Sequence, residues 1–241
     1  MFASTVSSPH PARIAVSVFF FIAGICFASW ASRIPDIQRH LQLNEAGLGT
    51  VLFALPVGSM LSLPVAGILV TKFGSRNIML FSAIVYALLL CLLGIVDATW
   101  QLVTVLFFFG ASGDFMNISI NTQAVNIEAL YGRSIMASFH GLWSMAGFAG
   151  AAIGSLMVAQ AIQPFIHFLL IASLVALLIV FVFRHSLPYD TAHPESQSGF
   201  AWPEKSLLKL GVIAFCCMAC EGCMFDWSGF IFAKKCKYQN S

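Results

Sequence analysis

Seven long apolar segments, separated by short polar breaks, make up most of this 241-residue chain. Each is near or above the length of about 17–25 residues that a helix needs to cross a bilayer. Because the hydrocarbon core offers the backbone no hydrogen-bond partners, each segment must satisfy its own backbone groups as a helix. The segments are residues 14–30, 48–70, 78–96, 102–127, 134–161, 164–183 and 207–232. We therefore predict an all-α fold, a polytopic transmembrane helical bundle in a lipid bilayer.

The composition agrees with a membrane protein and excludes other classes. Apolar residues make up 59% of the chain and charged residues 9%, whereas an ordinary soluble domain is about 25% charged. The net charge is +2 without a basic arm or an aromatic-basic patch, so we expect no nucleic-acid partner. Arg13 and the segment after it resemble the start of a signal peptide, but the run continues and further spans follow, so we interpret it as the first span.

The basic residues predict the orientation of the spans. With the N-terminus in the cytoplasm, the first six spans leave seven basic residues inside and two outside, which is the positive-inside bias. The inside residues are Arg13, Lys72, Arg76, Arg133, Arg184, Lys205 and Lys209, and the outside residues are Arg33 and Arg39. Residues 184–206 contain three prolines and are typical of a cytoplasmic linker. We predict a multi-pass protein of a cell membrane, the bacterial cytoplasmic (inner) membrane, with its N-terminus inside.

Short motifs accompany five of the spans. They are ASWASRIP at residues 28–35, GILVTKFGSR at 67–76, NIE at 126–128, HGLWS at 140–144, and EG and DW at 221–222 and 226–227. In this order on these spans, they resemble the major facilitator superfamily, and in particular its fucose-permease-like branch. Residues 67–76 resemble the cytoplasmic gate motif of the superfamily, through Gly67, Lys72, Gly74 and Arg76. Thr71 stands where that motif usually has an aspartate.

The resemblance implies a division of the chain. Such transporters have about twelve spans in two halves, with the solute between the halves near the midplane. Residues 1–183 would be the six-span N-terminal half, 184–206 the cytoplasmic linker, 207–232 the seventh span and 233–241 an aberrant tail. We expect a truncated or frame-shifted product. The alternative is a short form that pairs with another chain, either a second half or a second copy.

The fourth span carries the richest set of polar residues. At 100° per residue, Asp114, Asn117, Asn121 and Glu128 fall within about 60° of one another, whereas Gln123 points the opposite way. Amides and carboxylates suit a cavity that binds a hydroxylated solute. The alternative is hydrogen bonding that holds helices together. Glu128 lies near the inner surface, where we expect it to pair with Arg133 or with lipid head-groups.

Other polar residues give further candidates. Glu221 is near the midplane of the seventh span, where burial favours proton uptake, and Asp226 follows it; the alternative is pairing with a polar group on another span. His140 and Trp143 share a face and suit either solute binding or packing. Trp30 suits an interfacial belt or a cavity wall, and we expect Arg33 to snorkel to head-groups at the outer mouth.

The glycines and cysteines favour packing roles. Gly150 and Gly154, with Ala146, give small-residue spacing that lets helices approach closely. Cys217, Cys220 and Cys223 have metal-ligand spacing but lie within a continuous apolar helix, so we expect no bound metal and no cofactor. Pro56 and Pro64 are expected to kink the second span.

Three functions remain after these steps. With no nucleotide loop and no nucleophile elbow, the chain is not expected to be an enzyme or an ATP-driven pump. We predict a secondary active transporter of a small polar solute, such as a sugar, with proton symport when complete. The alternatives are a fragment without transport activity and, least favoured, an intramembrane enzyme that uses His140 with a carboxylate.

Overall fold

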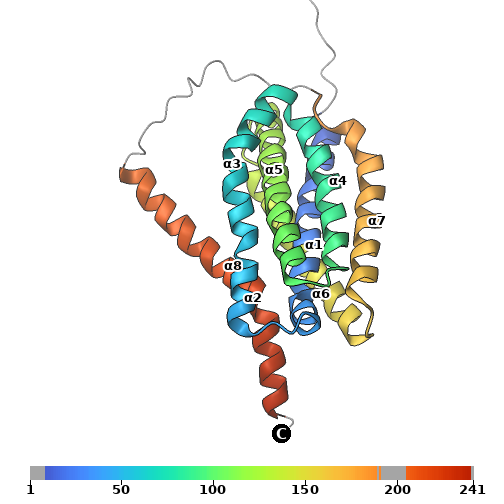
Figure 1. Cartoon of the computed structure of the whole chain (residues 1–241). Coiled ribbons are helices and arrows are strands. Elements are labelled where there is room, and N and C mark those ends of the chain that lie inside the picture. The colour runs from blue at the N-terminus through green and yellow to red at the C-terminus, as the bar shows by residue number, and fades with distance from the viewer. Residues whose placement is uncertain (1–8, 189, 191–204, 240–241) are drawn as a thin grey trace, which may run out of the picture. The chain divides into compact units, whose positions relative to one another are not determined.

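The computed structural model describes residues 9–188, 190 and 205–239, which are helical apart from short turns (Figure 1). The chain divides into two units, residues 1–190 and 191–241. The first contains α1 (His10–His40), α2 (Glu45–Leu52), α3 (Ala54–Phe73), α4 (Ser75–Leu93), α5 (Thr99–Tyr131), α6 (Met136–Ala159), α7 (Pro164–Val182) and the short 3-10 helix η1 (Phe183–His185). The second contains α8 (Lys205–Gln239). The prediction of an all-α helical bundle is confirmed.

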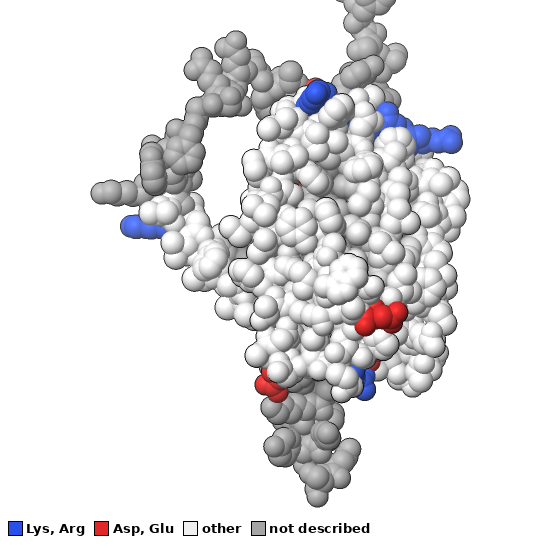
Figure 2. Space-filling model, viewed as in Figure 1, with Lys and Arg blue, Asp and Glu red and all other residues white. Residues whose placement is uncertain are grey.

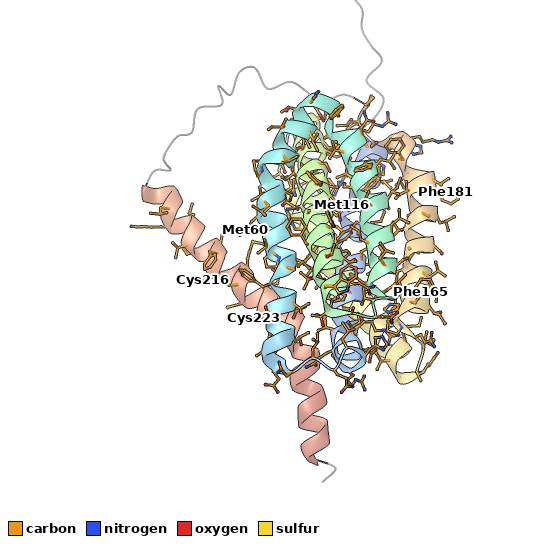
Figure 3. All side chains as sticks on the ribbon, in the orientation of Figure 1. Met60, Met116, Phe165, Phe181, Cys216 and Cys223 are labelled. Atoms are coloured by element: carbon orange, nitrogen blue, oxygen red, sulfur yellow. The ribbon has the colours of Figure 1, made fainter. Side chains whose placement is uncertain are left out.

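Six helical segments of the described residues are long and apolar enough to cross a membrane, with α2 and α3 together forming one of them. We call residues 9–190 the six-span unit. Its surface carries many large apolar side chains; Figure 3 shows Met60 and Phe181 pointing away from the helices, whereas Met116 is buried. On the face shown in Figure 2, charged side chains gather toward the two ends of the unit. This surface is suited to lipid rather than to water.

Two helices differ from their predicted ranges for local reasons. α1 continues past the apolar segment to His40, because the polar residues of its last turns find partners close by. The second span is interrupted at Phe53, between α2 and α3. Pro56 has no N–H to donate to the carbonyl of Leu52, so a break at this point fits its chemistry.

The seventh predicted segment corresponds to α8, which belongs to the second unit of the chain. The helix is continuous through the cysteines and extends to Gln239. Most of residues 233–241, expected to be a tail separate from the span, therefore belong to the helix. The linker residues 191–204 lie outside the described residues.

The helices of the six-span unit pair in a symmetric pattern. The most extensive contacts join α1 to α6, α3 to α5 and α4 to α5, followed by α1 to α7. If the unit is divided into two successive repeats of three spans, the first span of each repeat packs against the second and third spans of the other. This is the arrangement expected of two related repeats.

Glycines allow the two main helix pairs to approach closely. A Cβ on Gly58 of α3 would lie 2.0 Å from the carbonyl oxygen of Phe107, and one on Gly110 of α5 would lie 2.1 Å from that of Leu55. In the α1–α6 pair, a Cβ on Gly24 would lie 2.4 Å from the carbonyl oxygen of Trp143. Ala146, Gly147, Gly150 and Gly154 are all buried on α6. The predicted packing role of this small-residue stripe is confirmed.

Replacement of Gly58 by alanine tests the α3–α5 contact. The added methyl group would meet backbone, which cannot rotate away, so α3 and α5 must separate. We expect a destabilisation of about 1–3 kcal/mol, or a fall in thermal midpoint of about 2–4 °C for each kcal/mol, measured on the purified protein in detergent. Gly141→Ala on α6, where a Cβ would meet nothing within 4 Å, is the matched control. Equal midpoints for the two variants would contradict the close contact.

Candidate functional site

The polar stripe of α5 begins at a contact with α3. Asp114 is half-buried, and its carboxylate accepts a hydrogen bond of 3.1 Å from the hydroxyl of Ser62. The same hydroxyl, which has one proton to share, also lies 2.8 Å from the carbonyl oxygen of Ser59. Among the ion pairs of the described residues, none involves Asp114. The carboxylate is therefore held by a neutral donor and keeps capacity for a proton or a further donor.

The next two residues of the stripe are more accessible. Asn117 is exposed and Asn121 is half-exposed on the same face of α5. The side-chain amide of Asn121 donates to the side-chain oxygen of Asn117 and to its backbone carbonyl, both at 2.8 Å. This pairing fixes the orientation of both amides on the surface of the six-span unit.

The candidates on α6 have different neighbours. His140 is exposed, and its ring lies edge-on to that of Phe20 on α1, with 5.3 Å between the ring centroids. Trp143 is half-buried, and its backbone carbonyl faces Gly24 of α1. His140 and Trp143 thus contact α1, whereas Asp114 contacts α3.

The structure corrects the two interpretations of Trp30. The side chain is 1% exposed, inside the six-span unit. It therefore belongs neither to an interfacial belt nor to a solvated cavity wall in this structure. Its indole Nε1 is buried without a hydrogen-bond partner among the described residues.

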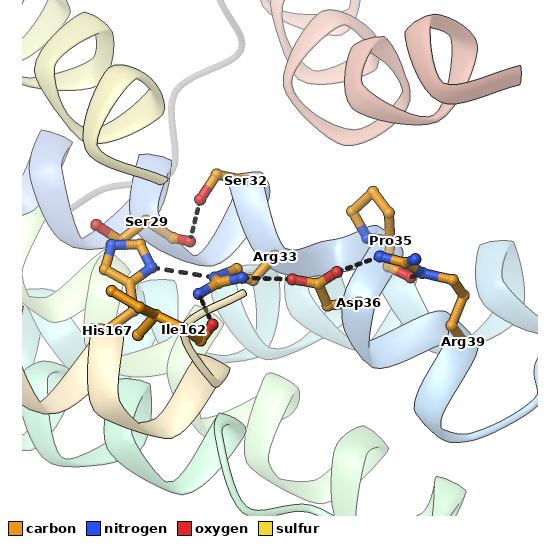
Figure 4. A network of polar contacts seen from close by, with 8 residues as sticks. All are labelled: Ser29, Ser32, Arg33, Pro35, Asp36, Arg39, Ile162 and His167. Atoms are coloured by element: carbon orange, nitrogen blue, oxygen red, sulfur yellow. Dashed lines mark hydrogen bonds and ion pairs between the residues drawn. The ribbon is translucent and has the colours of Figure 1, made fainter. Parts of the chain in front are cut away.

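The expectation that Arg33 snorkels to head-groups is also wrong, because its side chain is buried (Figure 4). The guanidinium donates to Asp36 one turn further along α1, at 2.5 Å, and to the carbonyl of Ile162 in the α6–α7 turn, at 2.5 Å. Its Nε donates to the Nδ1 of His167, at 3.3 Å. Asp36 also pairs with Arg39 at the exposed end of α1. These partners satisfy a charge that would otherwise be costly to bury.

His167 was missed by the sequence analysis. It lies in the first turn of α7 and is fully buried. The signal was a single imidazole near the start of a segment with a mean hydropathy of 3.0. α1 and α6 end on the same side of the membrane, and α7 begins only a few residues after α6. The start of α7, with His167, therefore lies at a depth similar to that of the last turns of α1.

The gate-motif residues lie at the opposite end of the unit, which we call the linker end (residues 73–75, 131–135 and 183–190). Gly74 ends α3 with a φ of +81°, a conformation that glycine adopts without strain. Lys72 and Gly67 are exposed, and Thr71 bonds back to carbonyls of its own helix. Arg76 donates to the Ser186 hydroxyl at 3.0 Å and to the Phe183 carbonyl at 3.2 Å, and it stacks on the Phe183 ring.

Asp190 binds the first turn of α4 at the linker end. Its carboxylate accepts from the backbone N–H of Ser75, at 2.7 Å, from the Ser75 hydroxyl, and from the amide of Asn126, at 3.2 Å. Gln123, buried on the inner face of α5, accepts from the N–H of Leu187 at 3.0 Å and donates to its carbonyl at 3.2 Å. Leu187 and Asp190 are thereby fixed to α4 and α5. An anion at a helix N-terminus is stabilised by the helix dipole.

Glu128 has a different partner from the one expected. Its carboxylate accepts from the backbone N–H groups of Ile135 and Met136, at 2.7 and 2.9 Å, and from the Ser134 hydroxyl, at 3.3 Å. It thus caps the start of α6 instead of pairing with Arg133. The first N–H groups of a helix have no partner within the helix, which explains the preference.

The two acidic candidates of the seventh segment lie on α8. Glu221 falls in the described part of the helix, and the side chain of Asp226 lies outside the described residues. Their expected part in proton coupling stays a prediction.

Replacement of Asp190 by asparagine tests the contact at the linker end. The amide keeps the shape but loses the charge at the α4 N-terminus, so we expect a loss of about 0.5–2 kcal/mol, by analogy with helix caps. Thermal unfolding of the purified protein measures it. Asp97→Asn is the control, because that carboxylate is 82% exposed and contacts only the exposed His40 among its described ion pairs. A control that loses as much stability as Asp190→Asn would contradict the special role of Asp190.

Comparisons with known proteins agree with this architecture. Residues 14–235 match the sequence profile of the Major Facilitator Superfamily. An uncharacterized MFS-type transporter of Yersinia pestis is 31% identical over 216 residues, which cover 90% of this chain and 56% of the relative. An uncharacterized transporter of Sinorhizobium fredii is 30% identical, over 88% of this chain and 57% of the relative. The chain thus spans about half the length of the curated relatives it matches.

A solved structure gives the same fold. The nucleoside transporter NupG superposes with a TM-score of 0.62 over 84% of this chain and 50% of that protein, at 17% sequence identity. At this identity, the likeness concerns the fold alone. From the family profile, the relatives and the six spans together, the chain belongs to the Major Facilitator Superfamily, whose members are multi-pass membrane transporters of small molecules and not enzymes.

Proposed function

We propose that the chain forms one half, and the first helix of a second half, of a secondary active transporter for a small polar solute. The observation that carries the proposal is the polar stripe of α5, which lies at the surface of the six-span unit within a predicted span. Asn117 is exposed, and Asp114 and Asn121 are partly exposed beside it. We assign the solute-facing role to these three residues, with His140 and Trp143 as further candidates on α6.

The sorting of polar groups on α5 supports this assignment. On its inner face, Gln123 and Asn126 are buried and bonded to other parts of the unit. Asn117 and Asn121 bond to each other on the outer face. Because amides and carboxylates are costly to expose to acyl chains, the outer stripe should face a second bundle or a water-filled path. In a two-half transporter this path lies between the halves, near the midplane.

The chemistry of the stripe favours a solute with several hydroxyl groups, such as a sugar. Each amide offers both donors and an acceptor, and the carboxylate offers acceptors, so together they can satisfy hydroxyls that do both. The sequence motifs favour the fucose-permease-like branch. The nucleoside transporter NupG has the same fold and, by its name, another hydroxylated solute, so we keep nucleosides as the second candidate class.

Proton symport is the coupling that we propose. Asp114 has a neutral hydrogen-bond donor and no ion pair among the described residues, which leaves its charge open to neutralisation by a proton. Glu221 and Asp226 on α8 remain candidates for the same task. The gate role assigned by resemblance to Gly67, Lys72, Gly74 and Arg76 is likewise a proposal.

Uptake should require two halves. Since the solute path lies between two bundles, we expect the six-span unit and α8 alone to give no solute-driven flux. A second half on the same chain, on another chain or in a second copy would provide the missing wall. The alternative, a fragment without transport activity, likewise predicts no flux by the chain alone, because it cannot alternate between two faces.

A fusion to the second half of the Yersinia pestis relative tests the solute face. We expect cells expressing this fusion to accumulate a labelled monosaccharide or nucleoside, and Asn117→Ala to lower that uptake about five- to tenfold through lost hydrogen bonds. Ser173→Ala, on the exposed face of α7, is the control, because its hydroxyl bonds only back to the Leu169 carbonyl in the structure. Undiminished uptake by Asn117→Ala would exclude the stripe from the path. No uptake of either solute class would contradict the proposed function.

Labelling from one side tests the proposed orientation. We place the N-terminus and the linker in the cytoplasm because, over the first six spans, this puts seven basic residues on that side and two on the other. In a variant without the native cysteines, a membrane-impermeant maleimide applied to intact cells should label Glu45→Cys, at the start of α2, and should not label Ser198→Cys in the linker. Labelling of Ser198→Cys from outside would reverse the topology.

A further inference from the structure

A polar cluster lies at the end of the six-span unit opposite to the linker, where α1 ends and α6 turns into α7. Its members are Ser29, Trp30, Arg33 and Asp36 of α1 and His167 of α7. Three of its polar atoms are buried without a partner among the described residues: Ser29 Oγ, Trp30 Nε1 and His167 Nε2. Unpaired buried polar atoms are rare, and each calls for an explanation such as a bound water or a functional role.

The contact with Arg33 fixes the protonation of His167. Because the guanidinium can only donate, Nδ1 must accept the bond from Nε, and the proton of the neutral ring must lie on Nε2. Nε2 is the atom that has no partner. The observed arrangement therefore needs a neutral imidazole that holds its proton on Nε2, the nitrogen without a partner.

The charges around His167 come from few groups. On α1, Asp36 forms ion pairs with both Arg33 and Arg39. These three side chains together carry one net positive charge. From α4, Cys91 contributes a neutral thiol, directed to the carbonyl of Phe168 at 3.8 Å. From α6, Gly154 brings uncharged backbone near the ring, since a Cβ added to this glycine would lie 3.6 Å from the ring Cε1. Among the described residues, no carboxylate contacts the ring directly.

We infer that His167 is a proton-binding site, and that its proton switches the contact between the end of α1 and the α6–α7 turn. A proton from the aqueous side binds Nδ1 and gives an imidazolium. The hydrogen bond from Arg33 Nε is then broken, since both atoms are donors and both groups are positive. Asp36, whose side chain is 18% exposed, connects this buried cluster to the aqueous side.

The cluster also contains an acceptor for the new cation. Ser29 lies one turn before Arg33 on the same face of α1, and Figure 4 draws it beside the imidazole. Its hydroxyl oxygen is buried and has no partner among the described residues, so the cluster holds a free acceptor for a ring N–H. Proton uptake removes the contact between Arg33 and the ring. Arg33 keeps its bonds to Asp36 and to the Ile162 carbonyl, but loses the one that joins it to α7.

Thermal unfolding at two pH values tests the inference on the chain in nanodiscs, without need of a solute. Free imidazole side chains titrate near pH 6.5, and the folded contact holds only the neutral form, so acid must weaken it. We expect the midpoint of the wild type to fall by about 3–6 °C between pH 7.5 and pH 5.0. In His167→Asn, the side-chain oxygen can still accept from Arg33 but gains no proton, so most of this fall should disappear.

The other histidines serve as controls for this measurement. The chain has six histidines, and His185 is exposed at the linker end. His185→Asn should keep the fall of the wild type. A fall in His167→Asn equal to that of the wild type would overturn the inference.

A spectroscopic measurement on the wild type covers the case in which His167→Asn does not fold. With ¹⁵N-labelled histidine, one imidazole should hold its proton on Nε2 at pH 7.5 and become an imidazolium only at a pH below that at which a free imidazole titrates, because the folded contact favours the neutral ring. Arg33→Gln, which keeps a donor but removes the charge, should move this step to higher pH. If every ring with the Nε2 proton titrates like a free imidazole, or if Arg33→Gln leaves the step in place, His167 is not the proton site.

Discussion

Apolar helices surrounded by lipid gain nothing from hydrophobic burial against each other, so close backbone contact must hold them together. In the six-span unit this contact depends on glycines at the two main helix pairs, where Gly58 and Gly110 join α3 to α5 and Gly24 joins α1 to α6. Both pairs occupy equivalent places in the two repeats of three spans. The remaining helices, α4 and α7, pack on this four-helix centre.

The close contacts separate the polar residues into two classes. Where helices touch, an amide or a guanidinium must bond within the protein, as Gln123 and Arg33 do. Where a helix has no neighbour within the unit, as along the outer face of α5, polar groups remain on the surface. One helix can therefore carry both a structural and a solute-facing set, one on each side. The same residue types serve the two purposes, and only the neighbours distinguish them.

This distinction explains what the sequence could and could not predict. Span positions follow from apolar length, and the shared face of Asp114, Asn117 and Asn121 follows from helical periodicity, because both are local properties. The burial of Arg33 depends on Ile162 and His167, more than a hundred residues away, and no local pattern reports these partners. The same holds for Asp190, whose partners lie on α4 and α5. The predicted partner of Glu128 was wrong for another reason. The prediction chose the nearest opposite charge, Arg133, and did not consider the unpaired N–H groups at the start of α6.

The two ends of the six-span unit are closed by different chemistry. At the linker end, Asp190 and Gln123 bond to backbone groups, hydroxyls and an amide, and Arg76 contacts neutral oxygens. None of these bonds involves an imidazole. At the opposite end, closure passes through an imidazole held beside a guanidinium. A change of pH on that side therefore acts on one end of the unit and leaves the other closed. Such asymmetry lets a protein with two membrane faces respond to the medium on one of them.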